Sequence, residues 1–145
     1  MSAPLKHASV LLALSLVLTG CASTNVAQTR YRLALVSDTF ASTLERLQTQ
    51  ETVWYSAGQI SPNDHAAWQR RIVRIALAGK AVNEALRSEP DAVAVADRAR
   101  VVVDLLDDLI TEQVIRLSDK ERQMALLLIE SLRSSILIYA AVAGD

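Results

Sequence analysis

Three serines, each standing three residues ahead of a carboxylate, divide the chain from residue 61 onward. They open the segments 61–64, 88–91 and 118–121. At a helix start, a serine hydroxyl and a carboxylate can bond the backbone N–H groups that have no partner inside the helix. Pro62 and Pro90 strengthen the first two starts, because proline in the first turn removes an N–H that would have had no partner. The pattern predicts three helices.

A fourth helix is predicted ahead of these three. It begins between Asn25 and Arg30 and ends near Gly58, since glycine accepts the positive φ that often ends a helix. In all four segments apolar residues recur at intervals of three and four, which is typical of a helix with one covered face. The expected core positions are Leu33, Val36, Phe40, Leu44, Leu47 and Trp54; Trp68, Ile72, Ile75, Gly79, Val82 and Leu86; Val95, Ala99, Val102, Leu106 and Leu109; and Met124, Leu128, Leu132, Ile136 and Tyr139.

The short connections between the four segments favour antiparallel neighbours. Only 4% of the residues are aromatic, and the chain holds four glycines and three prolines, a composition that disfavours sheet and disorder. The expected fold is therefore all-α, an up-down-up-down four-helix bundle. At residues 117–118 no glycine or proline interrupts the pattern, so one continuous helix is the alternative there.

The amino terminus has the layout of a secretory signal. Lys6 precedes an uncharged apolar run over residues 8–20, after which small residues follow. A membrane-spanning helix needs about 20 apolar residues, and this run is shorter and has no cationic flank behind it. We expect the segment to be removed.

The end of that run resembles the lipobox of bacterial lipoproteins. Leu18, Thr19 and Gly20 precede Cys21, the single cysteine of the chain. The resemblance implies cleavage between Gly20 and Cys21, with a diacylglyceryl thioether and an N-acyl chain on Cys21; a buried core cysteine is the alternative. In the family, aspartate after the cysteine marks retention at the inner membrane, and Ala22 stands here. The expected site is the outer membrane, facing the periplasm.

These observations divide the chain into three parts. Residues 1–20 form the signal peptide, 21–29 the lipidated cysteine and a tether, and 30–145 the bundle domain. Loss of Lys6 with the signal leaves 14 cations beside 16 anions, which gives no bulk attraction for nucleic acid. Cations prevail over residues 61–87 and anions over residues 88–117, so these two helices should attract each other as neighbours.

Candidates for chemistry are few. Asp104, Asp108 and Glu112 form one helical stripe that a carboxylate-bridged metal site would use, but a Glu-x-x-His partner is missing, so a solvated acidic face is favoured. His65 is the one histidine after cleavage and is read as a surface residue in the first turn of a helix. Without a serine or cysteine nucleophile held on a strained turn beside it, catalysis is not expected. No metal and no cofactor beyond the lipid are predicted.

Two regions are candidate contact surfaces. Both tryptophans lie at the corner between the first two helices, and Trp54, Tyr55, Trp68 and Arg71 are candidate partner contacts, with a hydrophobic plug as the alternative. Residues 134–144 are apolar on nearly every side, so this segment is either wrapped by the bundle, a self-association face or a lipid contact. The sequence thus favours a lipid-anchored envelope protein that binds a partner or itself; a phage-type envelope factor and a carboxylate-metal bundle are the alternatives.

Overall fold

A computed structural model describes residues 6–88 and 92–143 of the 145, and the side chains of residues 31–88 and 93–141. The chain divides into two units, residues 1–34 and 35–145. The helices are α1 (Lys6–Ser56), α2 (Pro62–Ser88), α3 (Ala92–Glu112) and α4 (Asp119–Ala143), with a short 3-10 turn, η1 (Val114–Arg116), before α4. The predicted signal, Gly20 and Cys21 lie outside the residues whose side chains are described.

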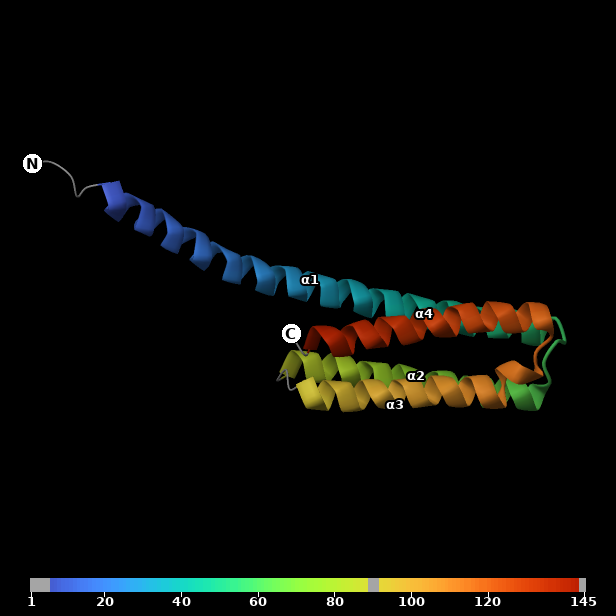
Figure 1. Cartoon of the computed structure of the whole chain (residues 1–145). Coiled ribbons are helices and arrows are strands. Elements are labelled where there is room, and N and C mark those ends of the chain that lie inside the picture. Colours follow the sequence, from blue (N-terminus) through green and yellow to red (C-terminus); the bar gives the residue numbers. More distant parts are fainter. Residues whose placement is uncertain (1–5, 89–91, 144–145) are drawn as a thin grey trace, which may run out of the picture. The chain divides into compact units, whose positions relative to one another are not determined.

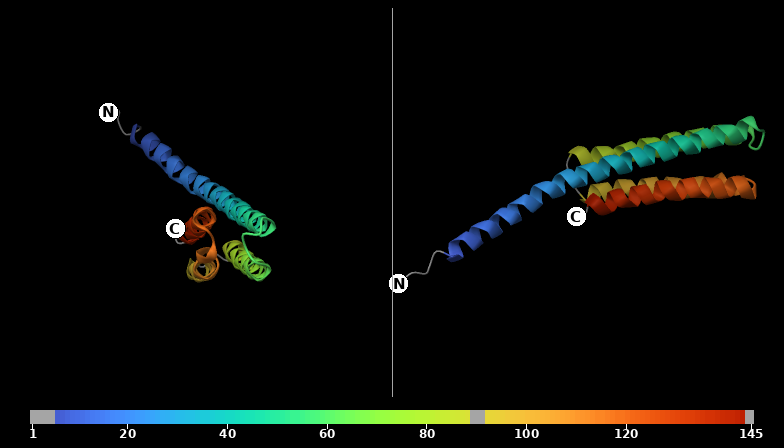
Figure 2. Two further views of the ribbon diagram at one scale, coloured as in Figure 1. Left: turned by 90° about the vertical axis from the view of Figure 1, so that its right-hand side faces the viewer. Right: turned by 90° about the horizontal axis from the view of Figure 1, so that it is seen from above.

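The second unit is an antiparallel four-helix bundle, as predicted (Figure 1). Its members are the part of α1 from Leu35 onward, α2, α3 and α4, and each packs against the next one along the chain. Figure 2 shows the four helices in cross-section, with α4 closing the ring against α1. The α1–α2 turn and η1 lie at one end of this unit, and the end of α2 and the start of α3 lie at the other (Figure 1).

The first unit consists of the earlier part of α1. The helix begins at Lys6, well before the start that we expected between Asn25 and Arg30. The intervening sequence is rich in alanine and leucine, and within α1 it contains no proline that would end a helix. The apolar run and the helix that follows it are continuous, and Gly20 does not interrupt them.

Local signals set the first turn. Gly58 has a φ of +72°, and the N–H of Gln59 donates to the carbonyl of Trp54 at 2.9 Å, so α1 ends at Ser56 as expected near this glycine. Ser61 then caps α2. Its Oγ accepts from the N–H of Asp64 at 3.1 Å, and its hydroxyl donates to the carboxylate of Asp64 at 2.7 Å.

The other two predicted starts behave differently. Ser88 is the last residue of α2, and its hydroxyl donates to the carbonyl of Glu84. The described part of α3 begins at Ala92, and the rest of the start predicted over 88–91 lies outside the described residues. At the joint before α4 the chain does break. Leu117 is extended, with φ −74° and ψ 156°, and Arg122 donates to the carbonyl of Leu117 at 2.8 Å. A side chain that satisfies the turn's carbonyls explains a break without glycine or proline.

The buried faces match the predicted stripes on α2 and α3 closely, and on α4 less so. All five expected positions on α3 are buried, and on α2 only Leu86 is replaced, by Ala85. On α4 the buried stripe is displaced by one residue at its start, so that Met124 and Leu128 are not buried. The buried side chains of α4 are Ala125, Ile129, Leu132, Ser135, Ile136 and Tyr139.

One helix segment within the described residues, Asp119–Ala141 of α4, is long and apolar enough to cross a membrane by length and composition. In the bundle its buried side supplies a quarter of the core, and the other side remains exposed, including Leu137 and Ile138. The interpretation that residues 134–144 are wrapped on all sides is therefore wrong for the described part of that segment.

The Ser61 cap yields a pH-dependent prediction. The hydroxyl of Ser61, followed by Arg116 at 3.0 Å, lowers the pKa of Asp64 below its ordinary value of 3.8. A lowered folded-state pKa stabilises the fold above the unfolded value, and the contribution is lost as the pH falls through the folded value. Ser61→Ala should therefore lower the free energy of unfolding by about 0.5–2 kcal/mol at pH 7, and by less below pH 3.8.

Chemical denaturation at pH 7 and at pH 3 measures both effects. Asn63→Ala, at an exposed position in the same turn, is the matched control and should stay within about 0.5 kcal/mol of the parent. A loss for Ser61→Ala that is the same at both pH values would contradict the role given to the carboxylate of Asp64.

Candidate functional site

The corner between α1 and α2 contains a polar cluster around a buried carboxylate. Glu51 is 0% exposed. Its Oε1 lies 2.6 Å from Nδ1 of His65, and its Oε2 accepts from Nε2 of Gln69 at 2.6 Å. Gln69 in turn accepts from Gln48. The carboxylate is thus held by donors from α2 on both of its oxygens.

Helical periodicity brings these residues together. Residues 51, 54 and 55 share one side of α1, and residues 65, 68 and 69 share one side of α2, because positions three and four apart face the same way. Each helix therefore presents a charged or polar group, a tryptophan and a second polar group to the other. These two faces form one cluster, which we name the tip cluster. Its members are Glu51, Trp54, Tyr55, His65, Trp68 and Gln69.

The aromatic members are packed in two pairs. The rings of Trp54 and Trp68 meet edge to face at 5.9 Å, and Tyr55 stacks on His65 at 4.1 Å with an angle of 8° between the planes. Trp54 is 3% and Trp68 1% exposed, whereas Tyr55 is 38% exposed. The tryptophans therefore close the end of the core, as in the plug interpretation, and the prediction that they are available as surface contacts does not agree with this burial.

The other predicted contact, Arg71, is engaged within the chain. Its guanidinium pairs with the carboxylate of Glu112 on α3. Across the same end of the bundle, Arg116 pairs with Asp64, and Gln59 donates to Glu121 at 3.1 Å. These contacts support the expected attraction between α2 and α3, and they tie the α1–α2 turn to the start of α4.

His65 is not the plain surface residue that the sequence suggested. Its side chain is 28% exposed and lies between Glu51 and Tyr55. With Nδ1 on the carboxylate, Nε2 is the ring nitrogen left to meet an outside group, an orientation also used by metal-binding histidines. The hydroxyl of Ser61, however, is directed to Asp64, so the described contacts do not form a serine–histidine pair.

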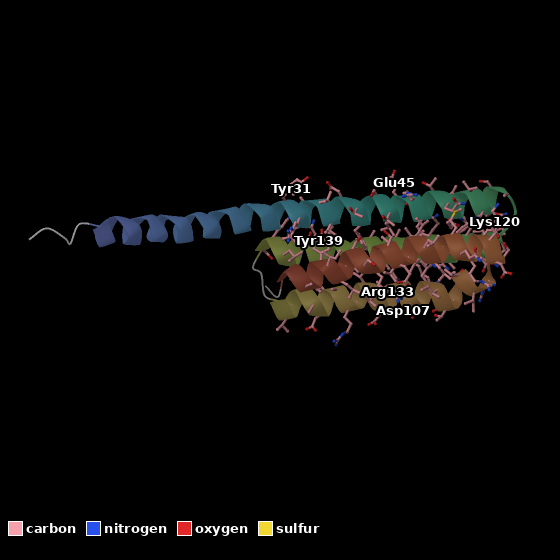
Figure 3. The ribbon with its side chains drawn as sticks, turned by 45° about the horizontal axis from the view of Figure 1, so that its top comes forward. Tyr31, Glu45, Asp107, Lys120, Arg133 and Tyr139 are labelled. Carbon is pink, nitrogen blue, oxygen red and sulfur yellow. The ribbon has the colours of Figure 1, made fainter. Side chains whose placement is uncertain are left out.

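The acidic stripe on α3 is exposed, and its member Glu112 and the adjacent Asp107 are used in ion pairs. Asp107 pairs with Arg133 of α4, as Figure 3 shows, and Glu112 pairs with Arg71. Among the side chains that the structure describes, no group of three His, Cys, Asp or Glu residues could hold a metal ion. Asp104 and Asp108 lie on the outer side of α3.

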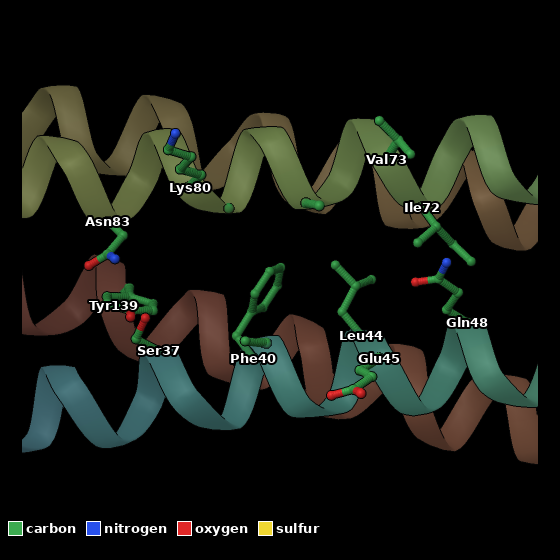
Figure 4. A pocket seen from close by; sticks show the side chains of 13 residues that line it. Ser37, Phe40, Leu44, Glu45, Gln48, Ile72, Val73, Lys80, Asn83 and Tyr139 are labelled. Atoms are coloured by element: carbon green, nitrogen blue, oxygen red, sulfur yellow. The ribbon is translucent and has the colours of Figure 1, made fainter.

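A groove of about 410 Å³ lies farther along the α1–α2 contact (Figure 4). Its apolar lining includes Phe40, Leu44 and Ile72, and Lys80 and Asn83 lie at its edge. Gly79 allows this arrangement, because a Cβ there would lie 2.5 Å from Cε1 of Phe40. At the end of the groove, burial raises the pKa of Tyr139, against a hydrogen bond with Ser37 that lowers it.

The sequence did contain a signal for the tip cluster. Leu44, Leu47, Glu51 and Trp54 follow spacings of three, four and three, so Glu51 occupies a position where the pattern requires a buried residue. A carboxylate at such a position needs a donor from another helix. His65 stands three residues before the buried Trp68, which places it on the matching face of α2.

Comparison with known proteins adds no relationship: no family model, no curated protein and no solved structure matches this chain.

The tip cluster can be tested by a double-mutant cycle. His65→Phe keeps the stacked ring but removes the donor to a buried carboxylate, and should lower the free energy of unfolding by about 1.5–3 kcal/mol. In a Glu51→Leu background the same change should cost at least about 1 kcal/mol less, because there is no carboxylate to leave unpaired. Urea denaturation of the four proteins gives the coupling energy; additive losses would show that the two residues stabilise the fold independently.

Proposed function

We propose that this protein is a lipid-anchored binding module of the bacterial envelope, acting through non-covalent contacts. The observation that carries the proposal is the sequence of residues 18–21 at the end of a short apolar run, directly ahead of a helical bundle. Lipid on Cys21 would hold the mature chain on the membrane. A diacylglyceryl group with an N-acyl chain supplies more than the single acyl chain that binds membranes only reversibly.

The outer membrane, on its periplasmic side, is the proposed location. Ala22 and Ser23 follow the cysteine in place of the aspartate that marks inner-membrane retention in the lipoprotein family. The bundle itself supplies the binding surface in this proposal. Neither the bundle's described contacts nor its charge suggests nucleic acid as the partner, since the mature chain carries slightly more anions than cations.

The exposed residues of the tip are the proposed contact surface. Tyr55, at 38% exposure, and Ile115, at 58%, lie at the end of the bundle formed by the α1–α2 turn and η1. Tyrosine is enriched among residues that dominate binding energy. Trp54 and Trp68 are buried in the core at this end of the bundle, and the ring of His65 stacks on Tyr55.

The lipid anchor leads to a direct prediction. Cys21→Ser should leave unlipidated precursor, because no thiol remains to accept the diacylglyceryl group. Globomycin, which inhibits the lipoprotein signal peptidase, should make the wild-type chain accumulate as prolipoprotein. Labelled palmitate and gel mobility report both effects. Unchanged mobility in both experiments, with no palmitate incorporated, would exclude the anchor.

The contact surface is tested by a matched pair of variants. Tyr55→Ala should abolish crosslinking of the protein to its envelope partner while its melting temperature changes little. Trp68→Ala empties a core site and should lower the free energy of unfolding by about 3–5 kcal/mol. It therefore shows what a loss of crosslinking caused by unfolding looks like. Site-specific photocrosslinking in the native cell and thermal denaturation measure the two effects. Undiminished crosslinking by a folded Tyr55→Ala variant would place the partner elsewhere.

A further inference from the structure

The outer side of α4 carries a second stripe, of apolar and small residues, opposite the one in the core. Its members follow spacings of three and four without interruption, and every one of them is exposed. Leu127 is 74% exposed, which makes it the most exposed large apolar side chain of the bundle's described residues. The stripe, named here the outer α4 stripe, consists of Met124, Leu127, Ser131, Ser134, Ile138 and Ala141.

Charges are sparse along this face. From residue 123 to residue 141 the sequence contains two charged residues, Glu130 and Arg133. These two pair with each other at 3.3 Å, and Arg133 also pairs with Asp107 of α3. By contrast, the outer sides of α2 and α3 carry exposed Arg70, Arg74 and Asp104. The stripe has the heptad spacing of a helix-packing seam, with large apolar residues toward its ends and small serines at its centre.

The order of residues in the outer α4 stripe is symmetric about its middle. A two-fold axis between Leu132 and Arg133 places Met124 opposite Ala141, Leu127 opposite Ile138, and Ser131 opposite Ser134. Large residues then meet apolar partners at both ends, and the two serines allow close approach in the centre. The same axis places the Glu130–Arg133 pair of one copy beside that of the other, so that the two pairs together carry no net charge.

We propose that the outer α4 stripe binds a second copy of this chain, with the two α4 helices antiparallel. A two-fold interface uses one patch on both subunits, so the patch must complement itself in shape and charge. The mirrored stripe and the Glu130–Arg133 pair meet both requirements. A lipid surface fits less well, because helices that lie on membranes carry cations beside their apolar face, and on this face Lys120 stands only at the start of α4.

Mixed-chain disulfide formation tests the dimer in the full-length protein within bacterial membranes. One tagged chain carries Ser131→Cys and an untagged chain carries Ser134→Cys. We expect a tagged–untagged disulfide dimer on mild oxidation. The matched control replaces Ser134→Cys with Ser42→Cys, an exposed serine on α1 outside the stripe, and should give at least about 10-fold less product. Equal yields in the two mixtures would overturn the proposal.

Oxidation of the unsubstituted chain, whose one cysteine is Cys21, distinguishes failure of the lipid-anchor proposal from failure of the dimer. A disulfide dimer of that chain would show that Cys21 carries a free thiol, which contradicts the anchor but not the stripe. The mixed-chain experiment is then repeated with Cys21→Ser in both chains. A product that depends on the 131–134 pair in that background still supports the dimer.

Leu127→Lys is the disrupting variant. Because the side chain is exposed in the single chain, the melting temperature should hardly change, whereas the yield of the 131–134 disulfide should fall at least about 10-fold. Val101→Lys, at a comparably exposed position on α3, should leave the yield unchanged. An undiminished yield with Leu127→Lys contradicts the interface. A lipid-binding face would give a different pair of results. The 131–134 disulfide would not form, and Leu127→Lys would release the Cys21→Ser chain from phosphatidylcholine vesicles.

Discussion

The bundle depends on covering one apolar face of all four helices at the same time. Leu47, Ile75, Leu106 and Ile136 each come from a different helix, and each is fully buried. Burial of apolar surface contributes about 25 cal/mol per Å², so no single helix of this kind is stable with its face in water. In the bundle, α2, α3 and α4 are 27, 21 and 25 residues long, which allows the faces to cover one another along most of their length.

Local patterns predicted the number of helices, the break at Gly58 and the buried face of α3, because capping and periodicity act within a few residues. They did not decide the register of α4. A stripe beginning at Met124 and one beginning at Ala125 both satisfy spacings of three and four and share their later members, so periodicity alone leaves the start of the buried stripe open. Which side faces the core depends on the shapes of α1 and α3, which a single helical segment does not contain.

The tip cluster was missed for a related reason. Charged residues are normally assigned to the surface, yet Glu51 is buried and depends on His65 and Gln69 from the next helix. A buried carboxylate without donors is costly, so sliding α2 along α1 by one turn would be strongly disfavoured. Apolar stripes tolerate such a shift, since one turn brings similar residues into the same places. The polar cluster therefore specifies the register that the apolar packing leaves open.

The amount of surface charge distinguishes the outer side of α4 from the outer sides of α2 and α3. Arg71 pairs with Glu112 and Arg116 with Asp64, and the remaining charges on α2 and α3 keep their outer sides in water. Each exposed pair contributes only about 0–1 kcal/mol, so their main effect is on solubility and on which helices are neighbours. The outer side of α4 has almost no such charge. This difference in charge between the outer side of α4 and the outer sides of α2 and α3 is the asymmetry on which the proposed dimer depends.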